Sequence, residues 1–166
     1  KSFFWILRLE DKMEDKFSFI VNGKTIVTTE DVNLLDFLRD DLGLISVKDG
    51  CKEGACGTCT ILVDGKAMKS CIFTTKKVAG KEITTIEGFT EREKEVFAYA
   101  FTECGAVQCG FCIPGMVVAA KALFLRTLDP TSDEVKKALV GNICRCTGYV
   151  KIEQAIMLAA KLFREN

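Results

Sequence analysis

The chain has 166 residues, 48% of them hydrophobic and 28% charged, which is the composition of a folded protein rather than a disordered one. Its 23 basic residues balance its 23 acidic residues, so the charge gives no reason to expect nucleic acid or an anionic membrane as the main partner. The chain contains no histidine, which excludes Ser/His and Cys/His nucleophile pairs, histidine metal sites and Rieske-type clusters.

Residues 1–12 fit the rest of the chain poorly. Met13 precedes the first predicted strand and could be the natural start, which would make residues 1–12 an extension or an expression remnant; an ordinary N-terminal strand or arm is the alternative. The apolar run at residues 3–7 is far too short to span a bilayer, and no small-residue cleavage site follows it. We therefore expect neither membrane insertion nor a secretory signal.

The first half of the chain reads as a small α+β unit. Its apolar patterning predicts strands at residues 17–21, 25–29, 60–63 and 83–86. Asn-Gly and Asp-Gly pairs at 22–23 and 64–65 are typical of type I′ hairpin turns. Apolar residues at helical spacing over 34–38 predict a helix between the two hairpins.

The second half reads as helical, with predicted helices at residues 91–101, 114–125, 132–140 and 151–164. Pro114 suits the first position of its helix, and Thr131 to Glu134 form a capping box at the start of the next. Four helices with short connections indicate an antiparallel bundle. We place the boundary near Gly88, which divides the chain into residues 13–88 and 89–166.

Nine cysteines are many for a chain that can bury a core without disulfide bonds, so metal binding or redox chemistry is favoured. Four of them, Cys51, Cys56, Cys59 and Cys71, have the spacing C-x4-C-x2-C-x11-C. The first three intervals match the plant-type ferredoxin arrangement, in which four thiolates hold a [2Fe–2S] cluster. Glycines in this loop let the backbone come close and point N–H groups at the sulfurs. Structural zinc is the weaker alternative, because zinc sites usually pair two short C-x2-C knuckles.

The second group of cysteines is less distinctive, since C-x2-C and C-x-C are common. It consists of Cys109, Cys112, Cys144 and Cys146. Both pairs lie at predicted helix N-termini, whose free N–H groups and positive dipole ends favour an anion such as a thiolate cluster. A [2Fe–2S] cluster, a zinc ion and free thiols all remain open here. Cys104 is the ninth cysteine, and we interpret it as a small buried apolar residue.

Taken together, three motifs resemble the iron–sulfur subunit of the molybdenum hydroxylases, the xanthine dehydrogenase, aldehyde oxidoreductase and carbon monoxide dehydrogenase family. These motifs are the run from Cys51 to Cys59 with Cys71, the sequence Gln108-Cys-Gly-Phe-Cys112, and the sequence 141–149, Gly-Asn-Ile-Cys-Arg-Cys-Thr-Gly-Tyr. The resemblance runs from about residue 17 to the C-terminus. It implies a ferredoxin-like β-grasp domain, a four-helix-bundle domain, and a [2Fe–2S] cluster in each.

The resemblance also implies partners. Electrons would pass from a molybdopterin cofactor in a large subunit, through the bundle cluster and the ferredoxin-like cluster, to FAD in another subunit. Gln108 matches a glutamine that hydrogen-bonds the pterin, and Cys146 matches a cluster ligand that also touches it. Judged on residue type alone, Gln108 reads as a surface amide capping a loop. The chain would be an electron-transfer subunit with no catalysis of its own.

A free-standing two-cluster ferredoxin is the rival interpretation. Shuttle ferredoxins tend to be strongly acidic, whereas this chain is neutral with a mean hydropathy of +0.17, which suits a permanent apolar interface. A zinc-stabilised interaction module is the third hypothesis. We expect a cytoplasmic location, because the thiolates must stay reduced. The substrate, whether xanthine, an aldehyde, an N-heterocycle or carbon monoxide, would be selected by the large subunit.

Overall fold

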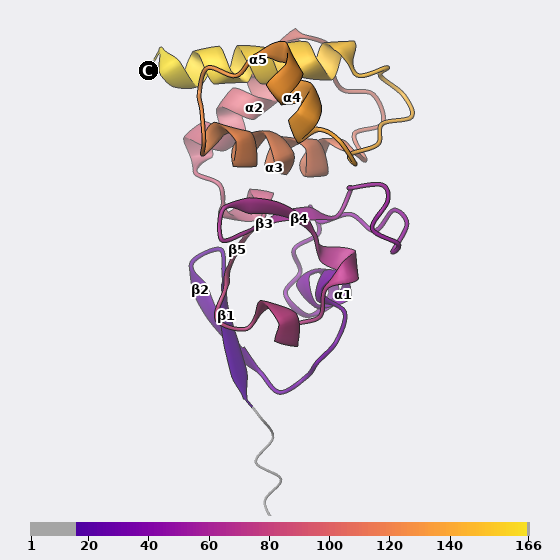
Figure 1. The fold of residues 1–166 in the computed structure, drawn as a ribbon, viewed down its shortest axis with the longest axis vertical. Coiled ribbons are helices and arrows are strands. Elements are labelled where there is room, and N and C mark those ends of the chain that lie inside the picture. The colour runs from indigo at the N-terminus through magenta and orange to yellow at the C-terminus, as the bar shows by residue number, and fades with distance from the viewer. Residues whose placement is uncertain (1–15, 166) are drawn as a thin grey trace, which may run out of the picture.

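A computed structural model describes residues 16–165 of the chain, so the expected extension at residues 1–12 lies outside it. The described part is an α+β structure in which a layer of helices lies above a five-stranded sheet (Figure 1). None of the helices in this part is both long and apolar enough to cross a membrane.

The sheet has the strand order β2-β1-β5-β3-β4, with β1 and β5 parallel and the other neighbours antiparallel. Its strands are β1 Phe17–Val21, β2 Lys24–Thr28, β3 Thr60–Val63, β4 Lys66–Lys69 and β5 Glu82–Thr84. Both predicted hairpin turns are confirmed, since each places two consecutive residues at positive φ, as a type I′ turn requires.

Two details of the sequence prediction are wrong in this half. Strand β4 was not predicted, because its sequence Lys-Ala-Met-Lys lies at the sheet edge and lacks the apolar residues that mark a buried strand. The predicted strand at 83–86 is shorter, because the chain turns into a 3-10 helix at Ile86–Gly88. The helix after the first hairpin is α1 Leu34–Asp36, continued by a π-helical turn, Phe37–Asp41.

The second half contains the helices α2 Glu91–Glu103, α3 Ile113–Phe124, α4 Ser132–Ala138 and α5 Val150–Arg164. The capping box at Thr131 and Glu134 is confirmed, and Thr90 and Glu93 form a second one at the start of α2. Helix α4 ends earlier than predicted, at Ala138, because the chain leaves the helix before Gly141 takes a positive φ of 85°.

Two hydrophobic cores stabilise the described part of the chain. One lies between the sheet and α1, and the other lies among the four helices. Strand β3 contributes to both, because Ile61 faces the first core while Leu62 belongs to the second. Helix α3 packs on β3, so the segments that carry the first group of cysteines are held against the helical layer.

Candidate iron–sulfur sites

The first cysteine loop, residues 51–59, leads into β3 and is shaped by its glycines. Gly54 and Gly57 have positive φ values of 73° and 71°. A Cβ on Gly50 would lie 2.6 Å from the Thr58 hydroxyl and 2.9 Å from Cys56 Sγ. The loop therefore depends on glycine at these positions, as the sequence predicted.

Backbone N–H groups of this loop converge on Cys51. The amides of Glu53 and Cys56 each donate to Cys51 Sγ at 3.4 Å. These amide hydrogen bonds, that of Cys56 first, lower the pKa of the Cys51 thiol to about 7. The loop thus favours a thiolate at this position, which is the form that binds iron.

Cys59 and Cys71 form the buried side of the same site. Ser70 donates its hydroxyl to the carbonyl of Cys59 at 3.0 Å, and Asn33 donates its amide to the carbonyl of Cys71 at 2.8 Å. Burial, followed by a hydrogen bond that the thiol of Cys71 donates to Cys59, raises the pKa of Cys71 to about 11. A thiol in this state needs a metal ion to become a thiolate at neutral pH.

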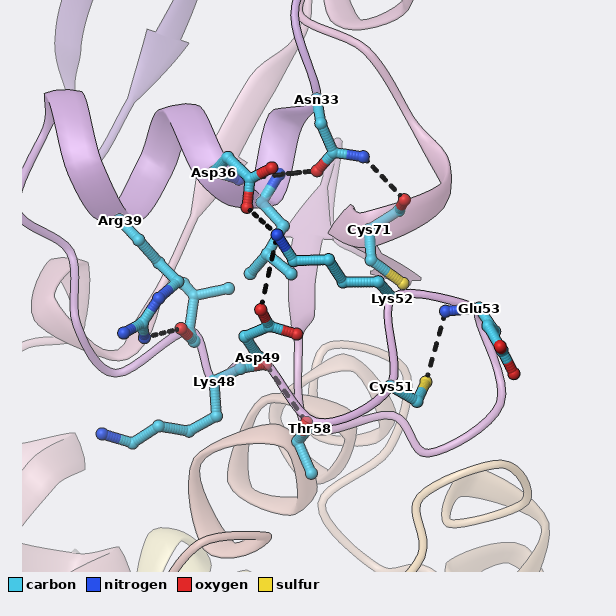
Figure 2. Close-up of polar contacts among 12 residues, drawn as sticks. Asn33, Asp36, Arg39, Lys48, Asp49, Cys51, Lys52, Glu53, Thr58 and Cys71 are labelled. Atoms are coloured by element: carbon cyan, nitrogen blue, oxygen red, sulfur yellow. Dashed lines mark hydrogen bonds and ion pairs between the residues drawn. The ribbon is translucent and has the colours of Figure 1, made fainter.

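Ion pairs fasten the exposed rim of the loop to α1 (Figure 2). The Lys52 ammonium lies 2.8 Å from the Asp36 carboxylate and 3.5 Å from that of Asp49. Lys52 itself has a positive φ of 53°, which is unusual for a residue with a side chain. The ion pairs of Lys52 with Asp36 and Asp49 therefore stabilise the conformation of the first cysteine loop.

The second group of cysteines lies where two helices begin. Cys112 is the N-cap of α3, and the segment with Cys144 and Cys146 leads directly into α5. Cys112 and Cys144 are buried, whereas Cys109 and Cys146 are exposed, with 3.7 Å between their sulfurs. The predicted placement at helix N-termini is thereby confirmed.

Two residues that the sequence did not single out organise Cys144. Thr147 directs its hydroxyl to Cys144 Sγ at 3.0 Å, and its amide donates to the same sulfur at 3.4 Å. Although burial works to raise it, the pKa of Cys144 is lowered by these hydrogen bonds. The hydroxyl of Tyr149, a residue with a positive φ of 71°, accepts from the Cys144 amide at 2.9 Å.

The eight cysteines come together as four pairs. The sulfurs of Cys109 and Cys146 lie 3.7 Å apart, and side-chain interactions that shift thiol pKa values link Cys51 with Cys56, Cys59 with Cys71, and Cys112 with Cys144. Within residues 16–165, no three cysteine or acidic side chains surround one point as ligands of a single metal ion would. Two pairs at each site match a [2Fe–2S] core, which takes two thiolates per iron.

The two sites adjoin each other, and we call the contact between them the junction; it joins Asn142 and Ile143 to Cys56 and Gly57. The amide of Ile143 donates to the carbonyl of Cys56 at 2.8 Å, and the buried Asn142 side chain donates to the carbonyl of Gly57 at 2.9 Å. A cleft of about 230 Å³ is lined from both sides by Cys56, Cys109, Cys112, Cys144 and Cys146, among others. The two predicted sites are therefore neighbours within one structure.

The remaining predicted residues lie at the edges of this region. Gln108 is exposed, and its side-chain amide donates to the carbonyl of Cys146 at 3.2 Å. Cys104 caps the C-terminus of α2 and, half-buried, packs against the helical core. The sequence did not mark Asn142, Thr147 and Tyr149 as functional residues, although all three stand inside the motif at 141–149.

Comparison with known proteins gives matches over both halves. A family model described as a 2Fe-2S iron-sulfur cluster binding domain matches residues 19–85, and one described as a [2Fe-2S] binding domain matches residues 85–157. The nicotinate dehydrogenase small FeS subunit of Eubacterium barkeri is 45% identical, over 85% of this chain and 92% of that protein. The xanthine dehydrogenase iron-sulfur-binding subunit of Escherichia coli O157:H7 is 43% identical, over 75% and 79%.

Solved structures give the same result. Quinoline 2-oxidoreductase from Pseudomonas putida 86 has a chain that superposes with a TM-score of 0.82 at 38% identity, over 91% of this chain and 96% of that one. The aldehyde oxidoreductase of Desulfovibrio gigas gives a TM-score of 0.83 at 38% identity. That match covers 90% of this chain but only 17% of the longer enzyme chain.

Proposed function

Because the chain belongs to the iron–sulfur subunits of the molybdenum hydroxylases, we propose that it connects a molybdopterin centre in a large subunit to a flavin in another subunit. It is an electron-transfer subunit of an oxidoreductase complex and carries two [2Fe–2S] clusters. The proposal extends this to the ligand set, the direction of the path and the partners at its two ends.

The proposed ligands are the four cysteine pairs, each pair holding one iron. Cys51, Cys56, Cys59 and Cys71 bind the ferredoxin-like cluster, and Cys109, Cys112, Cys144 and Cys146 bind the cluster among the helices. When bound, each cluster supplies one-electron redox chemistry. The chain itself supplies amide and hydroxyl hydrogen bonds to the sulfurs, which offset the negative charge of a reduced cluster and tune its potential.

The observation that carries the proposal is the junction between the two sites. Cys56 is a ligand of the first cluster, and Ile143 directly precedes Cys144, a ligand of the second. The hydrogen bond of 2.8 Å between the carbonyl of Cys56 and the amide of Ile143 links the two ligand sets by one short contact. Such a link suits a fixed relay better than two independent metal sites.

The exposed pair Cys109 and Cys146 marks the end that we assign to the molybdopterin. Gln108 adjoins this pair and bonds to the backbone of Cys146, so its amide is held beside the same exposed surface. A pterin held by the large subunit can be reached there by both a ligand sulfur and an amide. The exposed loop that carries Lys52 and Glu53 is the end that we assign to the flavin subunit.

The proposal has three further parts. We divide the chain into a ferredoxin-like domain at residues 13–88 and a four-helix-bundle domain at residues 89–166. We assign substrate choice to the large subunit, which would hold the molybdopterin centre. We expect the complex in the cytoplasm, where thiolates stay reduced.

Electron paramagnetic resonance of the reduced chain tests the ligand set. We expect Cys146→Ala to abolish the signal of the helical cluster while the ferredoxin-like signal persists, and Cys104→Ala to keep both signals. Two intact signals in Cys146→Ala would contradict the assignment. Metal analysis showing zinc without iron would overturn the cluster proposal altogether.

Co-purification from the native source separates the subunit from the free-standing ferredoxin. We expect a molybdopterin-containing large subunit and a flavin subunit to accompany the chain through successive columns. A chain that elutes alone and serves as a competent carrier would instead support the ferredoxin interpretation.

A further inference from the structure

Lys69, the last residue of β4, reaches across to the loop that carries the first cysteines. Its ammonium donates to the carbonyl of Gly54 at 2.6 Å and lies 3.4 Å from the carbonyl of Ala55. Ion pairs hold other lysines near this sheet, such as Lys52 with Asp36 and Lys81 with Asp64. The contacts of Lys69 are instead with the backbone of a cluster loop.

The two carbonyls belong to the peptide groups that face Cys51. The carbonyl of Gly54 shares its peptide group with the Ala55 amide, and the carbonyl of Ala55 shares its own with the Cys56 amide. The Cys56 amide donates to Cys51 Sγ at 3.4 Å, and the Ala55 amide makes a weaker interaction with the same sulfur. The cation therefore sits on the carbonyl side of two peptide groups whose N–H side addresses one thiolate.

A cation at a carbonyl oxygen polarises the whole peptide group and strengthens the hydrogen bond that its N–H makes on the other side. It also restrains the plane of that peptide group. Stronger N–H bonds to a cluster sulfur favour the reduced cluster, which carries one more negative charge.

The place of Lys69 is shaped by the second site as well. A Cβ on Gly141 would lie 2.9 Å from Lys69 Nζ and 3.4 Å from Lys69 Cε. The absence of a side chain at Gly141 leaves room for the lysine side chain to pass. The same glycine begins the segment Gly141 to Ile143 that forms the junction between the two sites.

We propose that Lys69 is a positioning residue that holds the Gly54 and Ala55 carbonyls, so that the attached N–H groups point at Cys51, and that it thereby raises the reduction potential of the ferredoxin-like cluster. This inference rests on the proposed ligand set. It concerns the chain's own peptide groups and requires no contact between Lys69 and the iron.

The test is a redox titration of the cluster-loaded full chain. Electron paramagnetic resonance monitors the titration, because each cluster gives its own signal. For Lys69→Met we expect the ratio of reduced to oxidised ferredoxin-like cluster at a fixed potential to fall roughly three- to tenfold. A tenfold change corresponds to about 59 mV for a one-electron couple. Lys69→Arg keeps a cation that can donate to the same carbonyls, and we expect it to recover most of the wild-type ratio.

Lys66→Met is the matched control, because Lys66 lies on the same strand, is exposed and has the same charge. We expect it to change the ratio less than a third as much. An equal effect of Lys66→Met and Lys69→Met would mean that Lys69 acts only through its positive charge, as any lysine on this strand would, and would overturn the proposal. An unchanged ratio in Lys69→Met would also overturn it. If Lys69→Met fails to retain the cluster, Lys69→Gln serves instead: a wild-type ratio there overturns the proposal, and a lowered ratio supports it.

The proposed function fails in a different way. Wild-type chain that shows fewer than two cluster signals would contradict the ligand set, whatever Lys69 does. Two wild-type signals combined with an insensitive Lys69→Met would leave the ligand set standing and remove only this inference.

Discussion

The amide of Ile143 donates a hydrogen bond of 2.8 Å to the carbonyl of Cys56, and this contact joins the two cysteine loops of the chain. It does not act alone. Asn142, the preceding residue, donates its side-chain amide to the carbonyl of Gly57 and to the hydroxyl of Thr60, at 2.9 and 3.2 Å. Backbone and side chain of two consecutive residues therefore hold the helical layer on the first cluster loop.

Asn142→Ala is expected to loosen this junction. Asn142 is 6% exposed, so removing its side chain leaves buried polar partners with fewer hydrogen bonds. We expect the free energy of unfolding to fall by about 1–3 kcal/mol. We also expect weaker magnetic coupling between the two reduced clusters, because their loops are no longer held together. Urea denaturation and electron paramagnetic resonance measure the two effects.

Gln154→Ala is a suitable control, because Gln154 is an exposed amide on α5. Its unfolding free energy should stay within about 0.5 kcal/mol of the wild-type value. An Asn142→Ala variant as stable as Gln154→Ala would show that the junction does not depend on this side chain.

Gly115→Ala is expected to separate the two layers by a steric route. Gly115 lies in the first turn of α3, where alanine normally favours the helix. Here, however, a Cβ would lie 2.2 Å from the carbonyl oxygen of Gly57. Since that oxygen belongs to the cluster loop, either the loop or the helix must shift, and we expect a loss of about 1–3 kcal/mol in unfolding free energy.

Gly80→Ala provides the comparison. Gly80 has a positive φ of 72° but open space around its Cβ position, so alanine there should cost only about 1–2 kcal/mol of backbone strain and leave both cluster signals unchanged. Altered line shapes in Gly115→Ala but not in Gly80→Ala would support the steric explanation. Unaltered line shapes in both would oppose it.

The first site was predictable because its determinants are local. Three of its four cysteines and its glycines lie within residues 50–59, and the structure keeps them in one loop. The hairpin turns were predictable for the same reason, since Asn-Gly and Asp-Gly dictate φ by themselves. Strand β4 escaped prediction because its pairing with β3, rather than its own sequence, makes it a strand.

The second site and the junction depend on tertiary structure. Cys112 and Cys144 come from different loops, and only the packing of α3 and α5 brings them together. Asn142 shows the same limit more clearly. Nothing in its neighbours indicates that its partners are Gly57 and Thr60, which lie in the other half of the chain.

Thr147→Val is expected to lower the reduction potential of the helical cluster. Its hydroxyl contacts Cys144 Sγ at 3.0 Å, and valine removes this hydrogen bond at nearly constant shape. A hydrogen bond to a charged group is worth about 1.5 kcal/mol, which is close to a tenfold change and about 59 mV for one electron. A redox titration of the second signal measures the shift.

Thr147→Ser retains the hydroxyl. We expect it to change the reduction potential of the helical cluster by less than a third of the shift expected for Thr147→Val. The ferredoxin-like signal serves as an internal reference, because the hydrogen bonds of Thr147 within residues 16–165 are to Cys144 and Tyr149 and not to the first loop. Equal potentials in the valine and serine variants would mean that the hydroxyl does not act on the cluster.

Glu93→Gln is expected to make the helical layer less stable in a pH-dependent way. Glu93 on α2 pairs with Lys121 on α3, and their side chains are only 17% and 23% exposed. Although burial works to raise it, the pKa of Glu93 is lowered by the hydrogen bond from Lys121, then by the hydrogen bond from the Thr90 amide and by the charge of Lys121. A depressed pKa means that the pair stabilises the fold fully above the ordinary glutamate value of about 4.3, and that this contribution disappears as pH falls through the folded value.

At pH 7 we therefore expect Glu93→Gln to lower the free energy of unfolding by about 1–3 kcal/mol, between the values for exposed and buried pairs. Glutamine keeps the capping box with Thr90, so the change isolates the charge. The difference from wild type should shrink toward zero below about pH 4. Urea denaturation at each pH, monitored by the helical circular dichroism signal, measures this difference.

Glu91→Gln is the matched control. Glu91 pairs with Lys94 in the same helix but is 85% exposed, so the loss of this pair should cost less than about 0.5 kcal/mol at any pH. A Glu93→Gln difference that stays constant from pH 7 to pH 3.5 would show that packing, and not the ion pair, is what the substitution removes.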